Sequence, residues 1–509
     1  TDKLLIYLFL NTYLLYILHP DPLLVVFPFP SRSHVILGNG YVKHLLKAGH
    51  EVTYITPVPM KHQENLHQID VSSNFEAVSD HLDLEKLINK DVDIMCPALV
   101  TEIMFNFTKA AVMHENVQKM LYDDKQQFDA VIVEWLYSEV FSGFAYVFNC
   151  PYIWSSSMEP HWAILSIIDE TPSPSYTSDQ VSSLVPPFSF TERVSNLFSY
   201  LLVELRNWQN YGRESDLYVT AFGEAAARRA HTLPTLDVAR LGAALMLGNS
   251  HVSVGQPVRL PQNYIPIAGY HIDDYVKPLP KDLQQLMDNA EHGVIYFSMG
   301  SLIKSQSLPK SIKHGLLDIF GQLKQTVLWK FEEELPNMPK NVHVLKWVPQ
   351  QSVLAHRNCV LFITHGGLLS KTEAVHYGVP IIGVPMFADQ FSNIDKAAVK
   401  GFAYRVDLDF DFPINLKKAI NEVIGNPRYR ERVKELSLIY HDRVVPPARE
   451  LVHWVEHVVR TRGAPHLRSP ALLLPWYQKL YLDFAALAIV TVFTMYLLLN
   501  SRQSVLLFI

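Results

Sequence analysis

Short apolar runs alternate along most of the chain with longer stretches in which apolar positions recur at helical spacing. Residues 23–29 form the first run, a helical pattern follows as far as Lys47 with Gly49 as its cap, and residues 51–56 form the next run. The rhythm returns over residues 128–155. Strands that alternate with helices are typical of parallel sheets, so the pattern predicts an α/β fold.

A second series of the same kind begins near Leu279 and continues to about residue 384. Between the two series, residues 255–280 are rich in proline and predict an interdomain connection. We therefore expect an N-terminal domain over residues 21–254 and a C-terminal domain with return helices over residues 281–475. Each would be a doubly wound parallel sheet, and the two would face each other across a cleft at the C-terminal edges of their strands.

Apolar runs of another kind lie at the two ends of the chain. Residues 1–20 contain an apolar stretch after Lys3 and predict the remnant of a secretory signal peptide. Residues 484–499 are almost entirely apolar and follow a group of tryptophan and tyrosine residues. An aromatic belt before an apolar helix is typical of a membrane anchor, so residues 476–509 predict a transmembrane helix with a short tail. A buried core helix is the alternative.

The orientation of that span follows from two opposing signals. Basic residues are concentrated before the span and only Arg502 follows it, which on charge alone would keep the body in the cytosol. A signal peptide commits a large N-terminal body to translocation regardless of charge, so we expect a single-pass type I protein with a lumenal body. The sequon at Asn106 fits that location as a glycosylation site.

Composition narrows the functional classes. Hydrophobic residues make up 49% and charged residues 18% of the 509 residues, which suits a membrane-associated enzyme. The formal net charge of −6 comes without a dense basic stripe and argues against a nucleic-acid partner. The cysteines, Cys96, Cys150 and Cys359, are scattered and odd in number, so neither a disulfide framework nor a cysteine-rich metal site is expected.

Candidate chemistry is concentrated in residues 347–390, where successive strand-to-helix corners carry an aromatic ring, amide and imidazole donors and a carboxylate. At the middle corner, His365 and two glycines follow an apolar strand and open a helix that Gly378 caps. Free backbone N–H groups and the positive end of the helix dipole make such a corner an anion site, and glycine lets a phosphate approach the chain closely. A diphosphate would fit there.

The neighbouring side chains suit the rest of a nucleotide-sugar. Trp347 offers a flat face to a base, and base stacking is worth roughly 1–3 kcal/mol where it has been measured. Gln350 and Glu373 can bond ribose hydroxyls, and Asp389 with Gln390 at the next helix start can bond sugar hydroxyls. This combination indicates an enzyme that moves a sugar.

The order and spacing of these residues resemble the UDP-glycosyltransferases, and the resemblance is closest to the insect membrane-bound members. It runs from about Leu23 to the C-terminus and implies the GT-B fold and residence in the endoplasmic reticulum membrane. It also implies that Trp347 stacks on uracil, that Gln350 and Glu373 hold the ribose, and that Asp389 and Gln390 hold the sugar. The diphosphate contacts are implied for Ser301, His365 and Gly367. Many relatives carry Asn where this chain has Leu369, so one contact is either missing or made by Ser370.

Catalysis requires a base that takes the proton of the attacking acceptor. A histidine at a corner such as that of His34 is in isolation more often a structural hydrogen bonder, but the relatives place their base in the same Pro-x-x-Ser-His context. Glu134, where many relatives have Asp, is the expected orienting partner, with a solvated carboxylate at a strand end as the alternative. His161 is a candidate only by type, and His44 and His50 are assigned to the helix surface and its exit.

The resemblance implies inverting transfer of a hexose, UDP-glucose in preference to UDP-glucuronate, to a small lipophilic acceptor. Aromatic residues of the N-terminal half favour such an acceptor, although residues of this kind more often belong to the core: Phe188, Phe190, Phe198, Tyr200 and Trp208. A pseudoenzyme that binds lipophilic ligands and a UDP-sugar epimerase stay open as alternatives. So does self-association into a homo-oligomer.

No metal or other cofactor is expected, because helix-end donors can carry the charge of the leaving diphosphate. The rival arrangement is a metal-dependent transferase with a pair of aspartates on Mn²⁺ or Mg²⁺. Pairs with that spacing occur at Asp91 with Asp93 and at Asp407 with Asp409, near Asp411. Neither pair lies at a nucleotide corner of the pattern.

Overall fold

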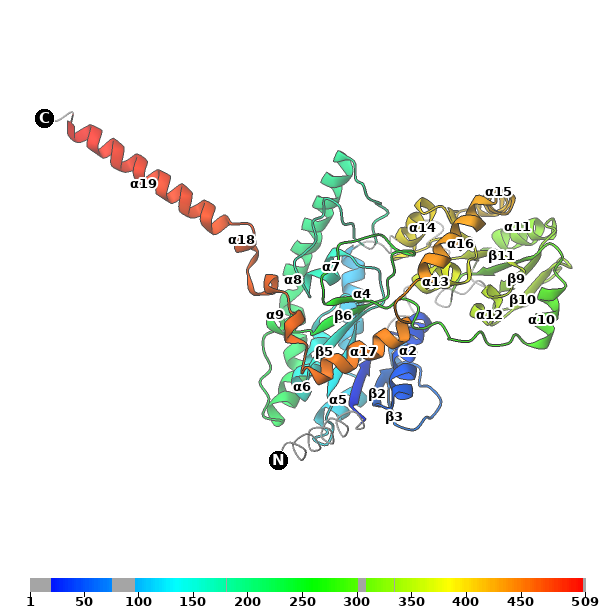
Figure 1. Cartoon of the computed structure of the whole chain (residues 1–509), viewed down its shortest axis with the longest axis horizontal. Coiled ribbons are helices and arrows are strands. Elements are labelled where there is room, and N and C mark those ends of the chain that lie inside the picture. Colours follow the sequence, from blue (N-terminus) through cyan, green and yellow to red (C-terminus); the bar gives the residue numbers. More distant parts are fainter. Residues whose placement is uncertain (1–19, 76–96, 180, 301–307, 334, 507–509) are drawn as a thin grey trace, which may run out of the picture.

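The structure is a computed structural model that describes residues 20–75, 97–179, 181–300, 308–333 and 335–506. Within these residues the chain forms two halves, each built on a sheet whose strand pairs are all parallel (Figure 1). Ser301, Asp91, Asp93 and Cys96, and the predicted signal peptide up to residue 19, lie outside the described residues.

The sheet of the first half has seven strands in the order β3-β2-β1-β4-β5-β6-β7. Alternate residues of β1 enter two different cores: Leu23 and Val25 belong to one, and Leu24 and Val26 to the other. Both faces of the sheet are therefore covered, as expected for a parallel sheet. The strands are β1 (Pro22–Val26), β2 (Glu51–Thr56), β3 (Leu66–Asp70), β4 (Ala130–Trp135), β5 (Tyr152–Ser156), β6 (Leu245–Gly248) and β7 (Tyr264–Pro266).

The longest helix of this half is α8, whose N-terminus is fixed by a capping box between Ser189 and Glu192. Helix α2 is capped at its C-terminus by Gly49, which has a φ of 98°, a left-handed conformation that glycine adopts without a steric penalty. The helices of the first half are α2 (Arg32–Ala48), α4 (Pro97–Val112), α5 (Glu115–Tyr122), α6 (Gly143–Phe148), α7 (Trp162–Ser166), α8 (Phe190–Arg228) and α9 (Leu236–Ala239), with short 3₁₀ turns at η1 (Ser72–Phe75) and η3 (Val140–Ser142).

The sheet of the second half has six strands in the order β10-β9-β8-β11-β12-β13. They are β8 (Val294–Ser298), β9 (Thr326–Lys330), β10 (Val342–Leu345), β11 (Cys359–Thr364), β12 (Ile381–Gly383) and β13 (Ala403–Arg405). Its helices are α10 (Lys281–Asp288), α11 (Lys310–Gly321), α12 (Gln350–Leu354), α13 (Leu368–Tyr377), α14 (Gln390–Val399), α15 (Phe412–Gly425) and α16 (Arg428–His441).

The chain crosses between the halves twice. Residues 255–280 include β7, so the first sheet extends into the range predicted as a connection. After α16, helix α17 (Pro447–Arg460) returns to the first half and packs against α2 (Figure 1). Its residues Leu451, Val455 and Val458 are buried in the same core as Leu23. The return helix therefore ties the end of the second half to the first sheet.

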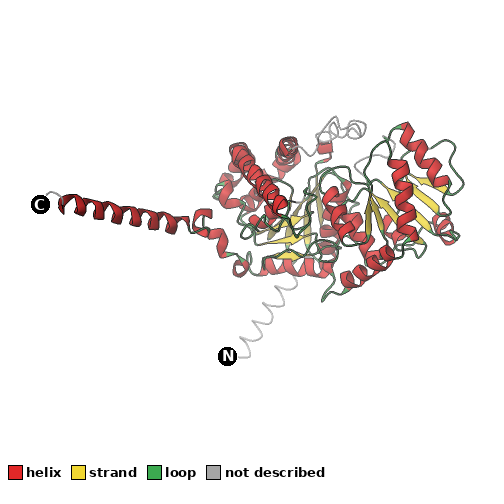
Figure 2. Cartoon of the chain, turned by 90° about the horizontal axis from the view of Figure 1, so that it is seen from above, coloured by secondary structure: helices red, strands yellow, loops and turns green. Residues whose placement is uncertain are grey.

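Helix α19 (Leu482–Leu506), preceded by the short 3₁₀ turns η5 (Pro465–Leu467) and η6 (Pro470–Leu473) and helix α18 (Trp476–Lys479), projects away from both halves (Figures 1 and 2). Its segment Leu482–Asn500 has 19 residues, a mean hydropathy of 2.1 and no buried residues. At ~1.5 Å per residue it is long and apolar enough to cross a bilayer. The alternative of a buried core helix is wrong, because no part of the described chain packs around it.

The placement of His44 on the helix surface is wrong, because His44 is buried and its Nε2 lies 2.7 Å from the carbonyl oxygen of Tyr270. His50 lies at the exit of α2 as predicted and is buried between Asp21 and Glu456. Both are therefore held by structural partners away from the strand edge that carries the candidate site.

Candidate active site

The first group of candidate residues lies at the C-terminal ends of β1 and β4, which are paired in parallel. The chain leaves β1 and enters α2 at Arg32, so His34 is the third residue of that helix. Glu134 belongs to β4 and is buried. Because the carboxyl ends of parallel strands meet at one edge of the sheet, these two side chains are brought together from positions 100 residues apart.

His34 and Glu134 are in direct contact. The imidazole Nδ1 lies 2.5 Å from Oε1 of Glu134, and the two side chains are 17% and 1% exposed. Among the described residues, Oε2 of Glu134 has no hydrogen-bond partner. Burial alone would lower the pKa of His34, but the charge of Glu134 and the hydrogen bond to it outweigh burial and raise that pKa above 6.5. The buried carboxylate therefore makes this imidazole more basic than a free one.

Asp389 of the second half also raises the pKa of His34 by its charge, although it lies at the start of α14. Oδ2 of Asp389 accepts a hydrogen bond of 2.8 Å from Nδ2 of Asn393. Burial raises the pKa of Asp389, and the Asn393 hydrogen bond and the charge of Lys371 oppose that rise. The predicted base and the predicted sugar-binding carboxylate, which come from different halves, are thus close enough to interact electrostatically.

Trp347 follows β10 and is 57% exposed. The guanidinium carbon of Arg32, which comes from the first half, lies 5.0 Å from the centre of its ring. This is a cation–π contact between the two halves, two residues before His34. The ring predicted to stack on a base is accessible and lies beside the helix that carries His34.

Gln350, Ser370 and Glu373 form one hydrogen-bonded group between α12 and α13. Nε2 of Gln350 donates to Oε2 of Glu373 at 2.7 Å and lies 3.2 Å from Oγ of Ser370. Oε1 of Gln350 accepts from the hydroxyl of Tyr296 at 3.2 Å. Glu373 is buried, and Gln351 donates to its other oxygen. The predicted ribose-binding residues are therefore brought together and held in fixed orientations.

The His365 corner depends on glycines at two places. A Cβ added at Gly300 would lie 2.6 Å from Cε1 of His365, and one added at Gly367 would lie 2.6 Å from its Nε2. The imidazole therefore lies between two backbone segments, and neither could come so close to the ring if its glycine carried a side chain. Burial, with a further contribution from the charge of Lys330, lowers the pKa of His365 to about 4, so the ring is neutral at pH 7.

Gln390 is buried, and part of its side chain is already used within the loop. Its Oε1 accepts from the backbone N–H groups of Met386 at 2.9 Å and Phe387 at 3.3 Å. The amide oxygen thus shapes the corner before α14, and Nε2 is the atom left for a sugar hydroxyl. Leu369, which replaces the Asn of many relatives, packs against the core of the first half.

Sequence reasoning missed Glu159 and Lys371. Lys371 lies on α13 directly after the glycine corner and is fully buried, with its Nζ 2.6 Å from Oε1 of Glu159 in the first half. A lysine among buried positions of a helix is the one local signal, since such a charge needs a partner. Nothing in the sequence indicates which carboxylate that partner is.

The remaining candidates are Asn106, His161 and Asp407. Asn106 is exposed on α4, whereas the Thr108 of its sequon is buried. His161 is buried at the start of α7, and burial lowers its pKa to about 4. Asp407 accepts a hydrogen bond from Nε of Arg405 at 2.8 Å. Within the described ranges, no group of three or more His, Cys, Asp or Glu side chains could hold a metal ion.

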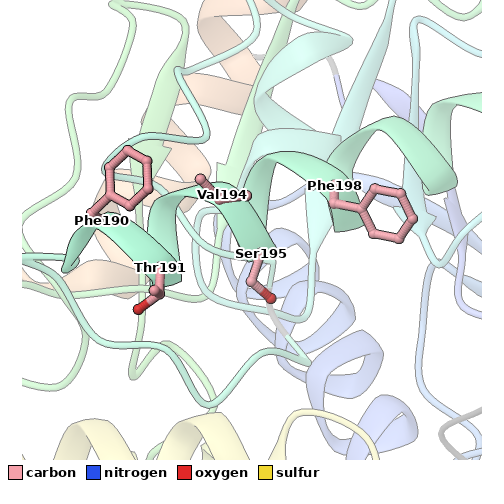
Figure 3. A pocket seen from close by; sticks show the side chains of 5 residues that line it. All are labelled: Phe190, Thr191, Val194, Ser195 and Phe198. Carbon is pink, nitrogen blue, oxygen red and sulfur yellow. The ribbon is translucent and has the colours of Figure 1, made fainter.

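Three of the aromatic residues named in the sequence lie on the exposed part of α8, whereas Phe188 before the helix is buried. Phe190, Phe198 and Trp208 are 71%, 62% and 76% exposed, so the core assignment is wrong for them. Phe190, Val194 and Phe198 line a shallow apolar hollow along one side of the helix, with Thr191 and Ser195 at its border (Figure 3). This hollow is formed by α8 alone and includes neither His34 nor the glycine corner.

Comparison with known proteins matches the chain to a single family. The family model described as UDP-glucoronosyl and UDP-glucosyl transferase matches residues 23–505. The chain is 32% identical over 481 residues to UDP-glucosyltransferase 2 of Dactylopius coccus, covering 92% of this chain and 90% of that protein. It is 30% identical over 469 residues to UDP-glucuronosyltransferase 2B15 of Rattus norvegicus, covering 87% and 85%.

Solved structures of glycosyltransferases have the same arrangement of two halves. The calicheamicin glycosyltransferase CalG4 matches with a TM-score of 0.58 at 18% identity, covering 88% of this chain and 100% of that one. The glycosyltransferase of kitacinnamycin matches with a TM-score of 0.57 at 19% identity, covering 87% and 100%. At these identities the likeness concerns the fold alone.

Proposed function

Because the chain belongs to the UDP-glycosyltransferase family and is an enzyme of that kind with the GT-B fold, we propose that it transfers glucose from UDP-glucose to a hydroxyl of a small lipophilic acceptor. The observation that carries the proposed mechanism is the 2.5 Å contact between His34 and Glu134 at the edge of the first sheet. Similarity to an insect UDP-glucosyltransferase supports glucose as the sugar.

In the proposed reaction His34 is the general base. With Nδ1–H donating to Glu134, Nε2 has a free lone pair that accepts the proton of the acceptor hydroxyl. The acceptor oxygen then forms a bond to the anomeric carbon while the bond from that carbon to the UDP oxygen breaks. Glu134 stabilises the imidazolium that results. A single displacement of this kind inverts the configuration at the anomeric carbon.

The donor is proposed to bind to the second half. The exposed ring of Trp347 would stack on uracil, and Gln350 and Glu373, with Ser370 beside them, would hold the ribose. The diphosphate would be bound at the His365 corner, where neutral imidazole and free backbone N–H groups at the start of α13 can donate, together with Ser301. Asp389 and Nε2 of Gln390 would bind the sugar.

We propose that this chemistry proceeds without a metal, because donors at the glycine corner can carry the charge that develops on the leaving UDP. Activity is expected to survive EDTA. Activity that EDTA abolishes and Mn²⁺ or Mg²⁺ restores would favour the alternative with paired aspartates.

The proposed location is the membrane of the endoplasmic reticulum, with α19 as the anchor and the catalytic body in the lumen. The exposed 19-residue apolar segment of α19 supports anchoring. Glycosylation at the exposed Asn106 would support the lumenal orientation. The glycan is expected to resist a glycosidase in sealed microsomes and to be removed once detergent opens them.

The test is release of UDP with a panel of phenols, flavonoids and steroids as acceptors and UDP-glucose, UDP-glucuronate or UDP-galactose as donors. Wild-type protein is expected to release UDP in an acceptor-dependent way with UDP-glucose, and His34→Ala to lose about 10²–10⁴-fold in rate. Equal slow release by both would refute transfer by His34 and favour a pseudoenzyme. Conversion of the UDP-sugar without an acceptor would instead indicate an epimerase.

A further inference from the structure

A charged cluster is buried where the two halves meet, outside the residues used above. Glu159 follows β5 in the first half, and its two oxygens accept from two cations of the second half. Nζ of Lys371 on α13 lies 2.6 Å from Oε1, and Nζ of Lys396 on α14 lies 3.3 Å from Oε2. All three side chains are at most 9% exposed. One carboxylate of the first half therefore joins two helices of the second.

Lys371 connects this cluster to the sugar-binding corner. Its Nζ also donates to Oδ1 of Asn393 at 3.2 Å. Nδ2 of Asn393 donates to Oδ2 of Asp389 at 2.8 Å and to the carbonyl oxygen of Gly366 at 3.1 Å. An ammonium group can only donate, so Lys371 determines that the oxygen of the Asn393 amide faces it. The nitrogen must then face Asp389 and Gly366, both of which can only accept here.

We infer that Glu159, Lys371 and Asn393 are positioning residues that hold Asp389 and the glycine corner in the arrangement that a UDP-sugar requires. The identity of that ligand rests on the proposed function. Glu159 lies in the half that carries the base, whereas Asp389 lies in the half that binds the donor. The chain of contacts therefore makes the geometry of the sugar site depend on the approach of the two halves.

Charge and space both support a fixed role for Glu159. Burial would raise the pKa of Glu159, but the charges of Lys371 and Lys396 outweigh it and lower that pKa to about 2, so the carboxylate stays ionised near neutral pH. A Cβ added at Gly255 would lie 3.0 Å from Cδ of Glu159 and 3.1 Å from each of its oxygens. The carboxylate therefore packs directly against Gly255, and a side chain at that position would displace it.

The first test is equilibrium binding by the full chain, measured by calorimetry with UDP and with UDP-glucose and without any acceptor. Glu159→Gln removes the charge that holds Lys371 and is expected to weaken UDP-glucose binding about tenfold or more, in line with loss of a charge-assisted hydrogen bond. UDP binding is expected to weaken less, because the uracil and ribose contacts at Trp347, Gln350 and Glu373 do not involve this cluster and only the diphosphate corner does. An unchanged ratio of the two affinities would overturn the inference.

A second variant separates positioning from stability. Glu159→Gln with Lys371→Met and Lys396→Met removes all three buried charges together, so the melting temperature should return toward that of the wild type. Affinity for UDP-glucose should stay low, because Asn393 has lost the donor that orients it. If affinity recovers together with stability, the cluster is merely structural and the inference fails.

Gly255→Ala offers a milder perturbation, and Gly212→Ala on α8 is its matched control, because a Cβ there meets no atom within 4 Å. Only Gly255→Ala should reduce UDP-glucose affinity. Equal effects of the two substitutions would count against the inference. The binding titration needs no acceptor, so it is independent of transfer. Wild-type protein that binds UDP-glucose but transfers sugar to no acceptor of the panel would refute the proposed function and leave this inference standing.

Discussion

Replacing Glu134 by Gln removes the charge beside the proposed base while keeping the size of the side chain. In the wild type, Nδ1 of His34 lies 2.5 Å from Oε1 of a carboxylate that is 1% exposed. Unit charges ~4 Å apart at an effective dielectric constant of ~20 interact by about 4 kcal/mol. At about 1.4 kcal/mol per tenfold in rate, loss of that stabilisation in the imidazolium-like transition state corresponds to about a 10³-fold fall in kcat/KM.

The pH dependence of the rate has a sign that the contacts determine. The base must be neutral to accept a proton, so the wild-type rate should rise as pH increases through the pKa of His34, which Glu134 and Asp389 raise above 6.5 against the effect of burial. In Glu134→Gln the contributions of Glu134 disappear and burial, which lowers the pKa, remains. The acid limb of the profile should therefore move to lower pH even though the maximal rate falls.

The assay is initial-rate UDP release over pH 5–9 at about saturating UDP-glucose with one phenol, for the wild type, Glu134→Gln and Glu134→Asp. The control is Glu435→Gln, an exposed carboxylate on α16 that pairs with Arg432. Affinity for UDP should be the same in all four proteins, because Glu134 lies in the other half. A Glu134→Gln protein with an unmoved acid limb, or with a rate like that of the control, would refute the assignment of Glu134 to His34.

Three further predictions concern the donor half and the anchor. Trp347→Ala should weaken UDP binding about 5–150-fold in a calorimetric titration, whereas Trp347→Phe should retain most of it; equal losses would argue against stacking. Gly300→Ala should lower both thermal stability and UDP-glucose affinity, because its φ is 84° and its Cβ would meet His365, while Gly49→Ala, with a φ of 98° and open space, should lower stability alone. Deletion of residues 476–509 should move the protein from the detergent phase to the aqueous phase on phase separation, and a truncated protein that stays in the detergent phase would contradict anchoring by α19.

Local pattern was sufficient for most of the two sheets. The apolar runs that lead to His365 and to Glu134 are strands β11 and β4, and the glycine caps after α2 and α13 lie where expected. The patterns did not predict β3 (Leu66–Asp70), β6 (Leu245–Gly248) or β13 (Ala403–Arg405), and they placed β7 in a connection. Short strands such as β7 and β13 carry too few positions to show a period. The central strands of both sheets could be predicted, and the full extent of the sheets could not.

Burial was harder to predict than secondary structure. His44 is polar yet buried, since the carbonyl of Tyr270, 226 residues further along the chain, supplies its partner. Trp208 is aromatic yet exposed, because α8 is longer than the core it covers. The pairing of Glu159 with Lys371 spans 212 residues. Contacts of this kind depend on how whole elements pack, and no window of sequence contains both partners.

Contacts between the two halves connect the proposed base with the proposed sugar site. The charge of Asp389 in the second half acts on His34, and Glu159 in the first half acts on Lys371. The Lys371 contact is buried and is screened little by salt, whereas Arg32 over Trp347 is exposed and is screened more. Higher salt should therefore weaken the contact of Arg32 with Trp347 before it weakens the contact of Lys371 with Glu159. His34 and Asp389 come from different halves, so neither half alone sets the protonation state of the proposed base.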